Sequence, residues 1–306
     1  IQAVGIGVYI AFGVFFNPLM ETFGWSRAVI SGASSAAFFI SGLFAILVGR
    51  ISDRTGPRTI MAVTGTCFGG GLILMAGIDS IWQLYLFFGL MFGVGLSSAD
   101  VIALPTIARW FPENRGRITG IVKVGTGAGQ FFFPFLASLM IAWMGWRHAF
   151  VVLGILSAGS LILIGRVIKK EPPVTDPPDP EIPAGSGKKG IRPAADSLSF
   201  SQASGTVQLW LVCLINFIIC SCLMSTLVHI VPYSRDIGIS VHRAAGVLST
   251  IGGVSMLGRF CTGVVIDKIG SKRAMFASLF ILIVGFLWLQ TADRLWQLYL
   301  FAAIYG

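Results

Sequence analysis

The sequence contains few charged residues for its length. Only 11% of its 306 residues are Asp, Glu, Lys or Arg, whereas 55% are hydrophobic. A typical soluble domain is about 25% charged. So little charge cannot cover a water-exposed surface of this size, which excludes an ordinary soluble domain and predicts a surface that faces lipid.

Histidine and cysteine are also scarce. The chain has three His and five Cys, and the cysteines lie inside apolar runs without the spacing of a disulfide framework or a metal site. The sequence also has no His-Glu-x-x-His or Gly-x-Ser-x-Gly motif. We therefore predict neither an enzyme nor a metal or cofactor site, and we interpret the cysteines as small packing residues.

Acidic residues are outnumbered by basic ones, with 13 Asp and Glu against 22 Lys and Arg, which gives a net charge of +9. The basic residues lie in short segments between apolar runs, and no basic stripe is interleaved with aromatic residues. This pattern is typical of cytoplasmic loops between membrane helices and does not predict a nucleic-acid partner.

Long apolar runs dominate the rest of the sequence, and a spanning helix needs about 20 such residues. Nine runs are long enough, and a tenth is cut short: 1–20, 28–49, 59–78, 81–108, 118–146, 148–165, 207–230, 244–266, 274–292 and 295–306. We predict an all-α polytopic membrane protein with a six-helix bundle over 1–168. A linker rich in Pro, Gly and Ser covers 169–206, and a partial bundle of three helices and part of a fourth covers 207–306.

The distribution of Lys and Arg predicts the orientation. Placing the first residue inside puts fifteen basic residues in inner loops and five in outer loops. Because cytoplasmic loops carry the excess of Lys and Arg, the amino terminus and the linker are expected in the cytoplasm of a multi-pass cell-membrane protein.

The two sides of the linker resemble each other at a constant offset of 214 residues, as from Pro18 to Pro232. The six residues from Trp82 to Phe87 return unchanged from Trp296 to Phe301. Six intervening helices preserve the membrane orientation, so this is a parallel repeat about an axis along the membrane normal. Since the chain begins without Met and stops inside an apolar run, we expect a fragment that lacks the last helices.

Two loop segments carry a family resemblance. The segment from Gly49 to Arg58 resembles the loop signature of the major facilitator superfamily, and the segment from Gly263 to Lys272 is similar to its second copy. The segments 21–27 and 109–116 are similar to the monocarboxylate transporter and oxalate–formate antiporter branch. The resemblance implies two six-helix bundles, here with the second truncated, and one central site that opens alternately to each side.

The resemblance also implies a cytoplasmic gate, in which loop carboxylates and basic residues tie helices together. Glycine permits tight turns and close helix approach, and a carboxylate is stabilised at a helix N-terminus. The alternative is that these loops carry only a topology signal. The gate residues expected on this basis are Gly49, Asp53, Arg54, Gly56, Arg58, Asp267, Gly270 and Lys272.

Three ionisable residues fall inside apolar runs, namely Asp100, Lys123 and Arg259. Each lies eight or nine residues from the inner end of its helix, about 12–13 Å deep. A charge at this depth is costly and marks a candidate functional site. By resemblance, Arg259 binds the anionic substrate; the alternative is an Arg paired with a helix end. Ser255 stands where several family members have an Asp, and at this position the sequence departs from that group's pattern of proton coupling.

Asp100 and Lys123 could form an ion pair between the fourth and fifth helices, or Asp100 could take up a proton. Ser255, which lies on the same polar stripe as Arg259, and Gln130 and Asn216 are further candidate residues of the substrate cavity. We predict a secondary transporter of a small mono- or dicarboxylate, acting as a functional monomer by proton symport or anion exchange. The alternatives are transport of a sugar or drug, or a non-transporting receptor.

Overall fold

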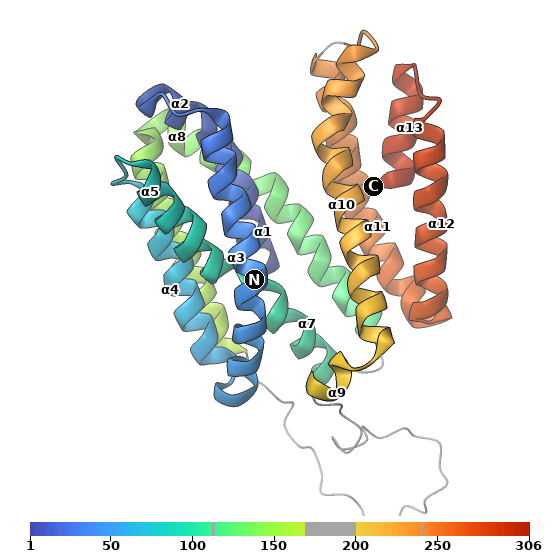
Figure 1. Cartoon of the computed structure of the whole chain (residues 1–306), viewed down its shortest axis with the longest axis horizontal. Helices are drawn as coiled ribbons and strands as arrows, with labels where there is room; N and C mark the ends of the chain where they lie inside the picture. The colour runs from blue at the N-terminus through green and yellow to red at the C-terminus, as the bar shows by residue number, and fades with distance from the viewer. Residues whose placement is uncertain (112–113, 169–199, 240) are drawn as a thin grey trace, which may run out of the picture. The chain divides into compact units, whose positions relative to one another are not determined.

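We describe the protein from a computed structural model, in which residues 1–111, 114–168, 200–239 and 241–306 are described (Figure 1). Most of the predicted linker, and Pro112 and Glu113 of one family segment, lie outside these residues. All regular elements in the described ranges are helical, as predicted.

The helices follow the predicted apolar runs closely. In the first part of the chain they are α1 (Gln2–Ala11), a 3₁₀ turn (Phe12–Phe15), α2 (Phe16–Phe23), α3 (Arg27–Thr55), α4 (Pro57–Met75), α5 (Ile81–Leu84), a π-helical stretch (Tyr85–Phe92), α6 (Gly93–Leu96), α7 (Ser98–Trp110) and α8 (Arg115–Val167). After the linker come α9 (Phe200–Ser204), α10 (Val207–Asp236), α11 (Val241–Ile269), α12 (Ser271–Leu289) and α13 (Leu295–Tyr305).

Helix α8 contains two of the predicted spans. Its 53 residues are interrupted at Gly145, whose φ of 77° and ψ of 162° are not helical. Because such a positive φ favours glycine, the chain turns there between the fifth and sixth spans. Seven helical segments among the described residues are long and apolar enough to cross a membrane, with α8 counted once.

Contacts divide the chain into two units. The first contains Ile1–Pro172, Gly252–Val284 and Tyr305–Gly306, and the second contains Pro173–Ile251 and Gly285–Ile304. Residues 169–199 of the predicted linker lie outside the described ranges, so the proposed domain boundaries at 168 and 206 stay a prediction.

The core of the first unit is a set of stacked phenylalanines. The ring centroids of Phe12 and Phe88 lie 3.7 Å apart, and those of Phe88 and Phe92 lie 4.5 Å apart. Phe15 stacks on Phe150 in α8 at 3.9 Å. Lipid provides little hydrophobic drive for helix association, so close packing of such rings contributes to the cohesion between these helices.

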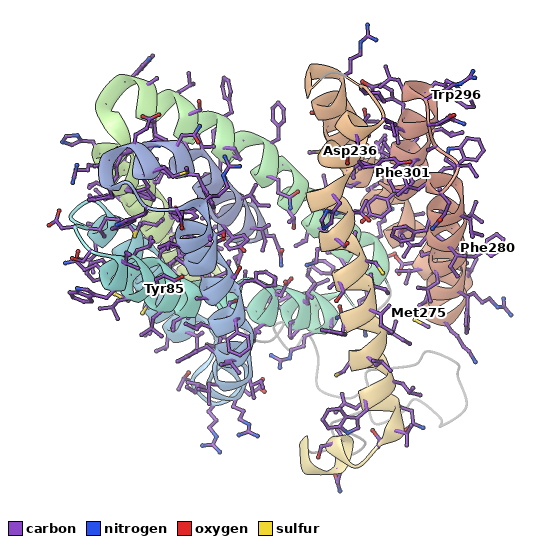
Figure 2. All side chains as sticks on the ribbon, turned by 45° about the horizontal axis from the view of Figure 1, so that its top comes forward. Tyr85, Asp236, Met275, Phe280, Trp296 and Phe301 are labelled. Atoms are coloured by element: carbon purple, nitrogen blue, oxygen red, sulfur yellow. The ribbon has the colours of Figure 1, made fainter. Side chains whose placement is uncertain are left out.

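Large apolar side chains also cover the outside of the helices. Phe280 on α12 is 68% exposed and Trp296 on α13 is 56% exposed, and both point away from the ribbon (Figure 2). Phe301 is fully buried and packs against Phe286 within the second unit. Exposed aromatic rings on long apolar helices are typical of a lipid-facing surface.

The 214-residue repeat extends to details of local geometry. Gln83 accepts hydrogen bonds from the backbone N–H groups of Asp79 and Ser80, and Gln297 does the same for Asp293 and Arg294. These are the same positions in the two copies, so both copies begin the helix with the same side-chain cap.

Glycines with positive φ recur at the same offset. Gly24 and Gly56 have φ of 68° and 84°, and their counterparts Gly238 and Gly270 have φ of 84° and 83°. A residue with a Cβ is strained in this conformation. The positions that end helices are therefore held by the same residue type in both copies.

Candidate functional site

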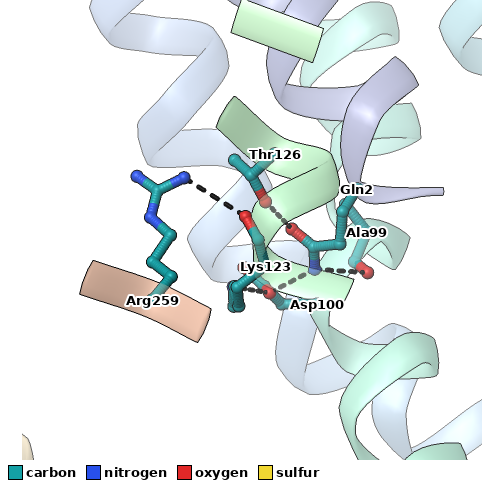
Figure 3. Close-up of polar contacts among 6 residues, drawn as sticks. All are labelled: Gln2, Ala99, Asp100, Lys123, Thr126 and Arg259. Atoms are coloured by element: carbon teal, nitrogen blue, oxygen red, sulfur yellow. Dashed lines mark hydrogen bonds and ion pairs between the residues drawn. The ribbon is translucent and has the colours of Figure 1, made fainter. Parts of the chain in front are cut away.

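The intramembrane charges lie where α7 and α8 meet, with α1 and α11 beside them (Figure 3). Glycines allow α8 and α11 to approach closely. A Cβ added to Gly120 would lie 2.8 Å from the carbonyl oxygen of Arg259, and one added to Gly263 would lie 3.0 Å from the Cα of Gly120. Backbone contact of this kind is possible only where small residues face each other.

Asp100 and Lys123 form an ion pair. The Lys123 Nζ lies 2.5 Å from Asp100 Oδ1, and their side chains are 32% and 52% exposed, respectively. Of the two arrangements that the sequence left open, the structure contains the pair between α7 and α8. Such a pair offsets the cost of placing each charge in an apolar environment.

Gln2 on α1 completes this cluster and was not identified from the sequence. It is 3% exposed, and its Nε2 donates to Asp100 Oδ1 at 2.5 Å and to the Ala99 carbonyl at 3.2 Å. Its Oε1 accepts from the Thr126 hydroxyl at 3.1 Å. The Gln2 amide therefore joins α1, α7 and α8, and both donors to Asp100 reach the same carboxylate oxygen.

Arg259 approaches the cluster from α11. Its guanidinium donates to the Lys123 carbonyl oxygen at 3.2 Å, and the residue is half-buried. No carboxylate lies within ion-pair distance of it in the described parts of the chain. A partly desolvated guanidinium whose protein partner is a neutral carbonyl retains its full charge, which an anion can neutralise.

The remaining candidate cavity residues are placed differently. Ser255 donates its hydroxyl to the Gly252 carbonyl of its own helix, at 2.8 Å. Gln130 is half-buried on α8, one turn beyond Thr126. Asn216 is exposed on α10 in the second unit, where its Oδ1 accepts from the Cys220 thiol. Within the first unit, the structure thus brings together Asp100, Lys123 and Arg259, and the role of Asn216 stays a prediction.

In the first loop signature, Asp53 pairs with Arg109. Asp53 Oδ1 lies 3.2 Å from the Arg109 guanidinium, which joins α3 to α7 near their ends. Gly56 ends α3 with its positive φ and leads directly into α4 at Pro57. A Cβ on Gly49 would make an ordinary contact of 3.5 Å with Val101.

In the second loop signature, Asp267 binds a helix N-terminus. Its Oδ1 accepts from the Gly116 N–H and its Oδ2 from the Arg117 N–H, both at 2.7 Å. These donors belong to the first turn of α8, where N–H groups have no partner within the helix. The carboxylate satisfies two of them and interacts favourably with the positive end of the helix dipole.

The other expected gate residues make fewer contacts. Gly270 separates α11 from α12 with a positive φ, as Gly56 does in the first copy. Among the described residues, the structure assigns no hydrogen bond or ion pair to the side chains of Arg54, Arg58 and Lys272. Their expected role in the gate therefore stays a prediction.

Comparisons with known proteins agree with this architecture. A family model for the Major Facilitator Superfamily matches residues 2–306. The chain is 29% identical over 276 residues to the oxalate:formate antiporter of Oxalobacter formigenes, covering 88% of this chain and 62% of that protein. It is 25% identical over 284 residues to monocarboxylate transporter 13 of Bos taurus, covering 93% of this chain and 63% of that protein.

A solved structure shares the fold. The proton:xylose symporter XylE, bound to 6-bromo-6-deoxy-D-glucose, matches with a TM-score of 0.65 and 14% identity, over 99% of this chain and 76% of that one. The chain spans about three fifths of the length of the oxalate:formate antiporter and of monocarboxylate transporter 13.

These findings confirm the predicted polytopic helical fold and the resemblance to a family of transporters rather than enzymes. The family match covers almost every residue of this multi-pass membrane protein. The chain therefore belongs to the major facilitator superfamily.

Proposed function

We propose that the protein is a secondary transporter of a small carboxylate anion, working by alternating access as a proton symporter or an anion exchanger. Arg259 binds the substrate carboxylate, and Lys123 and Asp100 line the same site. The oxalate:formate antiporter and monocarboxylate transporter 13 are named for such anions, and both align with most of this chain.

Arg259 carries this proposal. Its guanidinium faces a backbone carbonyl at 3.2 Å and, within the described residues, no acidic side chain. A guanidinium presents a planar fork of donors that fits both oxygens of a carboxylate. A neutral sugar or drug would leave this charge without a counter-ion, so the geometry favours an anion.

The loop contacts support an inner gate. Asp267 holds the first turn of α8 through two backbone N–H groups, and Asp53 holds Arg109. Both contacts join helix ends and neither uses the intramembrane charges. We propose that they close the cytoplasmic side, with the amino terminus and the linker in the cytoplasm of the cell membrane.

Substitution of Arg259 tests the carboxylate site. In proteoliposomes containing the full-length protein, Arg259→Gln is expected to reduce carboxylate uptake at least about a hundredfold, because a charge-assisted bidentate contact of roughly 3 kcal/mol is lost. Arg259→Lys keeps the charge without the fork and is expected to retain a small part of the uptake.

Arg243→Gln is the matched control. Arg243 lies on the same helix, is exposed, and is sixteen residues nearer the other helix end. It should retain uptake within about twofold. Carboxylate uptake by Arg259→Gln at the wild-type rate would remove Arg259 from the binding role and contradict the proposal.

A further inference from the structure

The acidic residue Asp100 is paired with Lys123, one of the two basic residues of the site. An acidic residue is unexpected in a site that binds an anion. Asp100 Oδ1 is bound to Lys123 and to Gln2, each at 2.5 Å, whereas Arg259 has only a neutral carbonyl partner. The charges of Arg259, Lys123 and Asp100 sum to one positive charge. The cluster can therefore neutralise one negative charge, not two.

We propose that Asp100 is a specificity-determining residue that serves as a built-in counter-ion, so that the site selects anions carrying a single negative charge. This inference rests on the proposed carboxylate site. It assigns to Asp100 a role in choosing the substrate class, distinct from proton uptake and from a purely structural ion pair.

The contacts of Asp100 fix its position. Gln2 is 3% exposed and is itself held by the Thr126 hydroxyl and the Ala99 carbonyl. Its amide therefore cannot turn away from Asp100 without losing these contacts. Gln2 acts as a positioning residue, because it binds the same oxygen of Asp100 as Lys123 does and so holds the carboxylate in place.

The second oxygen of Asp100 matters for the same reason. Both donors reach Oδ1, and no partner of Oδ2 is assigned among the described residues, while half of the side chain is exposed. A second negative charge on a substrate bound at this cluster would add to the negative charge of the Asp100 carboxylate. At membrane depth, where charges are weakly screened, like charges at such separations repel strongly.

Neighbouring charges do not alter the sum. Helices α1, α3, α4, α6 and α8 pack against α7, and Lys123 is the one charged residue of theirs that contacts Asp100 within the described chain. Asp53, in the last turn of α3, is paired with Arg109 at the end of α7, nine residues from Asp100. The count of one net positive charge thus concerns Arg259, Lys123 and Asp100 alone.

Oxalate and oxamate are equal in size but differ in charge, so comparing them separates the effect of ligand charge from that of ligand shape. Oxalate carries two negative charges, and its monoamide oxamate carries one. In equilibrium binding to the full-length protein in nanodiscs, the wild type is expected to bind oxamate at least about tenfold more tightly than oxalate. Asp100→Asn raises the net charge to two, so the preference is expected to reverse in favour of oxalate by a similar factor.

Two further variants test the charge count. Lys123→Gln leaves a net charge of zero and should bind both ligands weakly. The double variant Asp100→Asn with Lys123→Gln restores one positive charge and should recover tighter binding of oxamate, but not of oxalate. A purely structural ion pair predicts that the double variant recovers both ligands equally.

Asp293→Asn is the control, because Asp293 is exposed two residues before α13 and its side chain has no assigned contact in the described chain. It should leave both affinities unchanged. If Asp100→Asn does not fold, the relative affinity of the wild type for the two ligands still tests the inference. Tighter binding of oxalate than of oxamate by the wild type would overturn it.

The outcomes separate the two proposals. Binding of neither ligand by the wild type and all charge variants overturns the carboxylate site and this inference together. Binding of both ligands with a ratio that Asp100→Asn does not change overturns the counter-ion role and leaves the carboxylate site standing.

Discussion

A single side-chain amide holds three helices together in this protein. Gln2 donates to Asp100 and Ala99 and accepts from Thr126, and it is almost fully buried. Buried polar groups are costly when they lose a partner, and inside a membrane no water replaces it. Gln2 therefore contributes to stability as well as to the position of the Asp100 carboxylate.

Replacement of Gln2 by leucine should reveal this contribution. Gln2→Leu keeps the approximate size but leaves the Thr126 hydroxyl without its acceptor and Asp100 with one donor fewer. The free energy of unfolding is expected to fall by about 1–3 kcal/mol. Thermal unfolding of the purified protein in detergent measures this change.

Gln208→Leu provides the comparison, because Gln208 is exposed at the start of α10. It is expected to change stability by less than about 0.5 kcal/mol. An equal effect of the two substitutions would show that the hydrogen bonds of Gln2 contribute nothing specific.

The sequence identified three of the clustered residues and missed two. Asp100, Lys123 and Arg259 are conspicuous because a charge inside an apolar run is costly without a purpose. Gln2 and Thr126 are neutral polar residues, which are tolerated in membrane helices for several reasons. Gln2 is the one strongly polar side chain near the start of the first run, and that signal could have found it. Its partners could not be found without the three-dimensional arrangement.

Among the elements, the crossing of α4 and α8 depends on glycine. A Cβ on Gly154 of α8 would lie 2.7 Å from both the Gly69 carbonyl oxygen and the Ile73 side chain of α4. Gly159, on the same helix, has open space where its Cβ would be. The two glycines therefore separate the effect of packing from the effect of helix propensity.

Gly154→Ala should destabilise the protein by about 1–3 kcal/mol, because the added methyl group forces two backbones apart. Gly159→Ala should be neutral or stabilise by up to about 1 kcal/mol, because alanine favours the helix. Thermal unfolding of the two variants side by side measures the difference. Equal stability of Gly154→Ala and Gly159→Ala would contradict the close packing of α4 and α8 at Gly154.

Helix existence was predictable from the apolar runs, but helix ends were less so. The prediction ended the second span at Gly49 and the eighth at Ile266, where charged residues begin, whereas α3 continues to Thr55 and α11 to Ile269. The charged residues remain helical until Gly56 and Gly270 supply a positive φ. Hydropathy predicts where the lipid-exposed part of a helix ends, whereas the helix itself ends where the backbone conformation changes. Nothing in the sequence marks the π-helical stretch Tyr85–Phe92.

At the scale of the whole molecule, the repeat organises the two parts of the chain. Tyr85 fills the space beside Gly32, and Tyr299 fills the space beside Gly246, at the same 214-residue offset. The repeat was visible in the sequence because the six-residue identity lies in register with a loop motif. It predicts that equivalent loops lie on the same side of the membrane.

The proposed orientation can be tested by labelling single cysteines in a background without the five native ones. Thr55→Cys marks an inner loop and Asp293→Cys an outer loop in the proposed topology. A membrane-impermeant thiol reagent should label Asp293→Cys in intact cells, and Thr55→Cys only after the membrane is opened. The reverse pattern would contradict the cytoplasmic placement of the amino terminus.

Lys123 binds one partner through its side chain and another through its main chain. Its ammonium holds Asp100, whereas its peptide oxygen holds Arg259. A substitution at this position therefore changes the first contact and leaves the acceptor of the second in place, whatever side chain is introduced. Every amino acid except proline, which would disrupt the helix, can be inserted there while the peptide oxygen that binds Arg259 is kept. A saturation library at this one codon can therefore vary the local charge independently of the arginine.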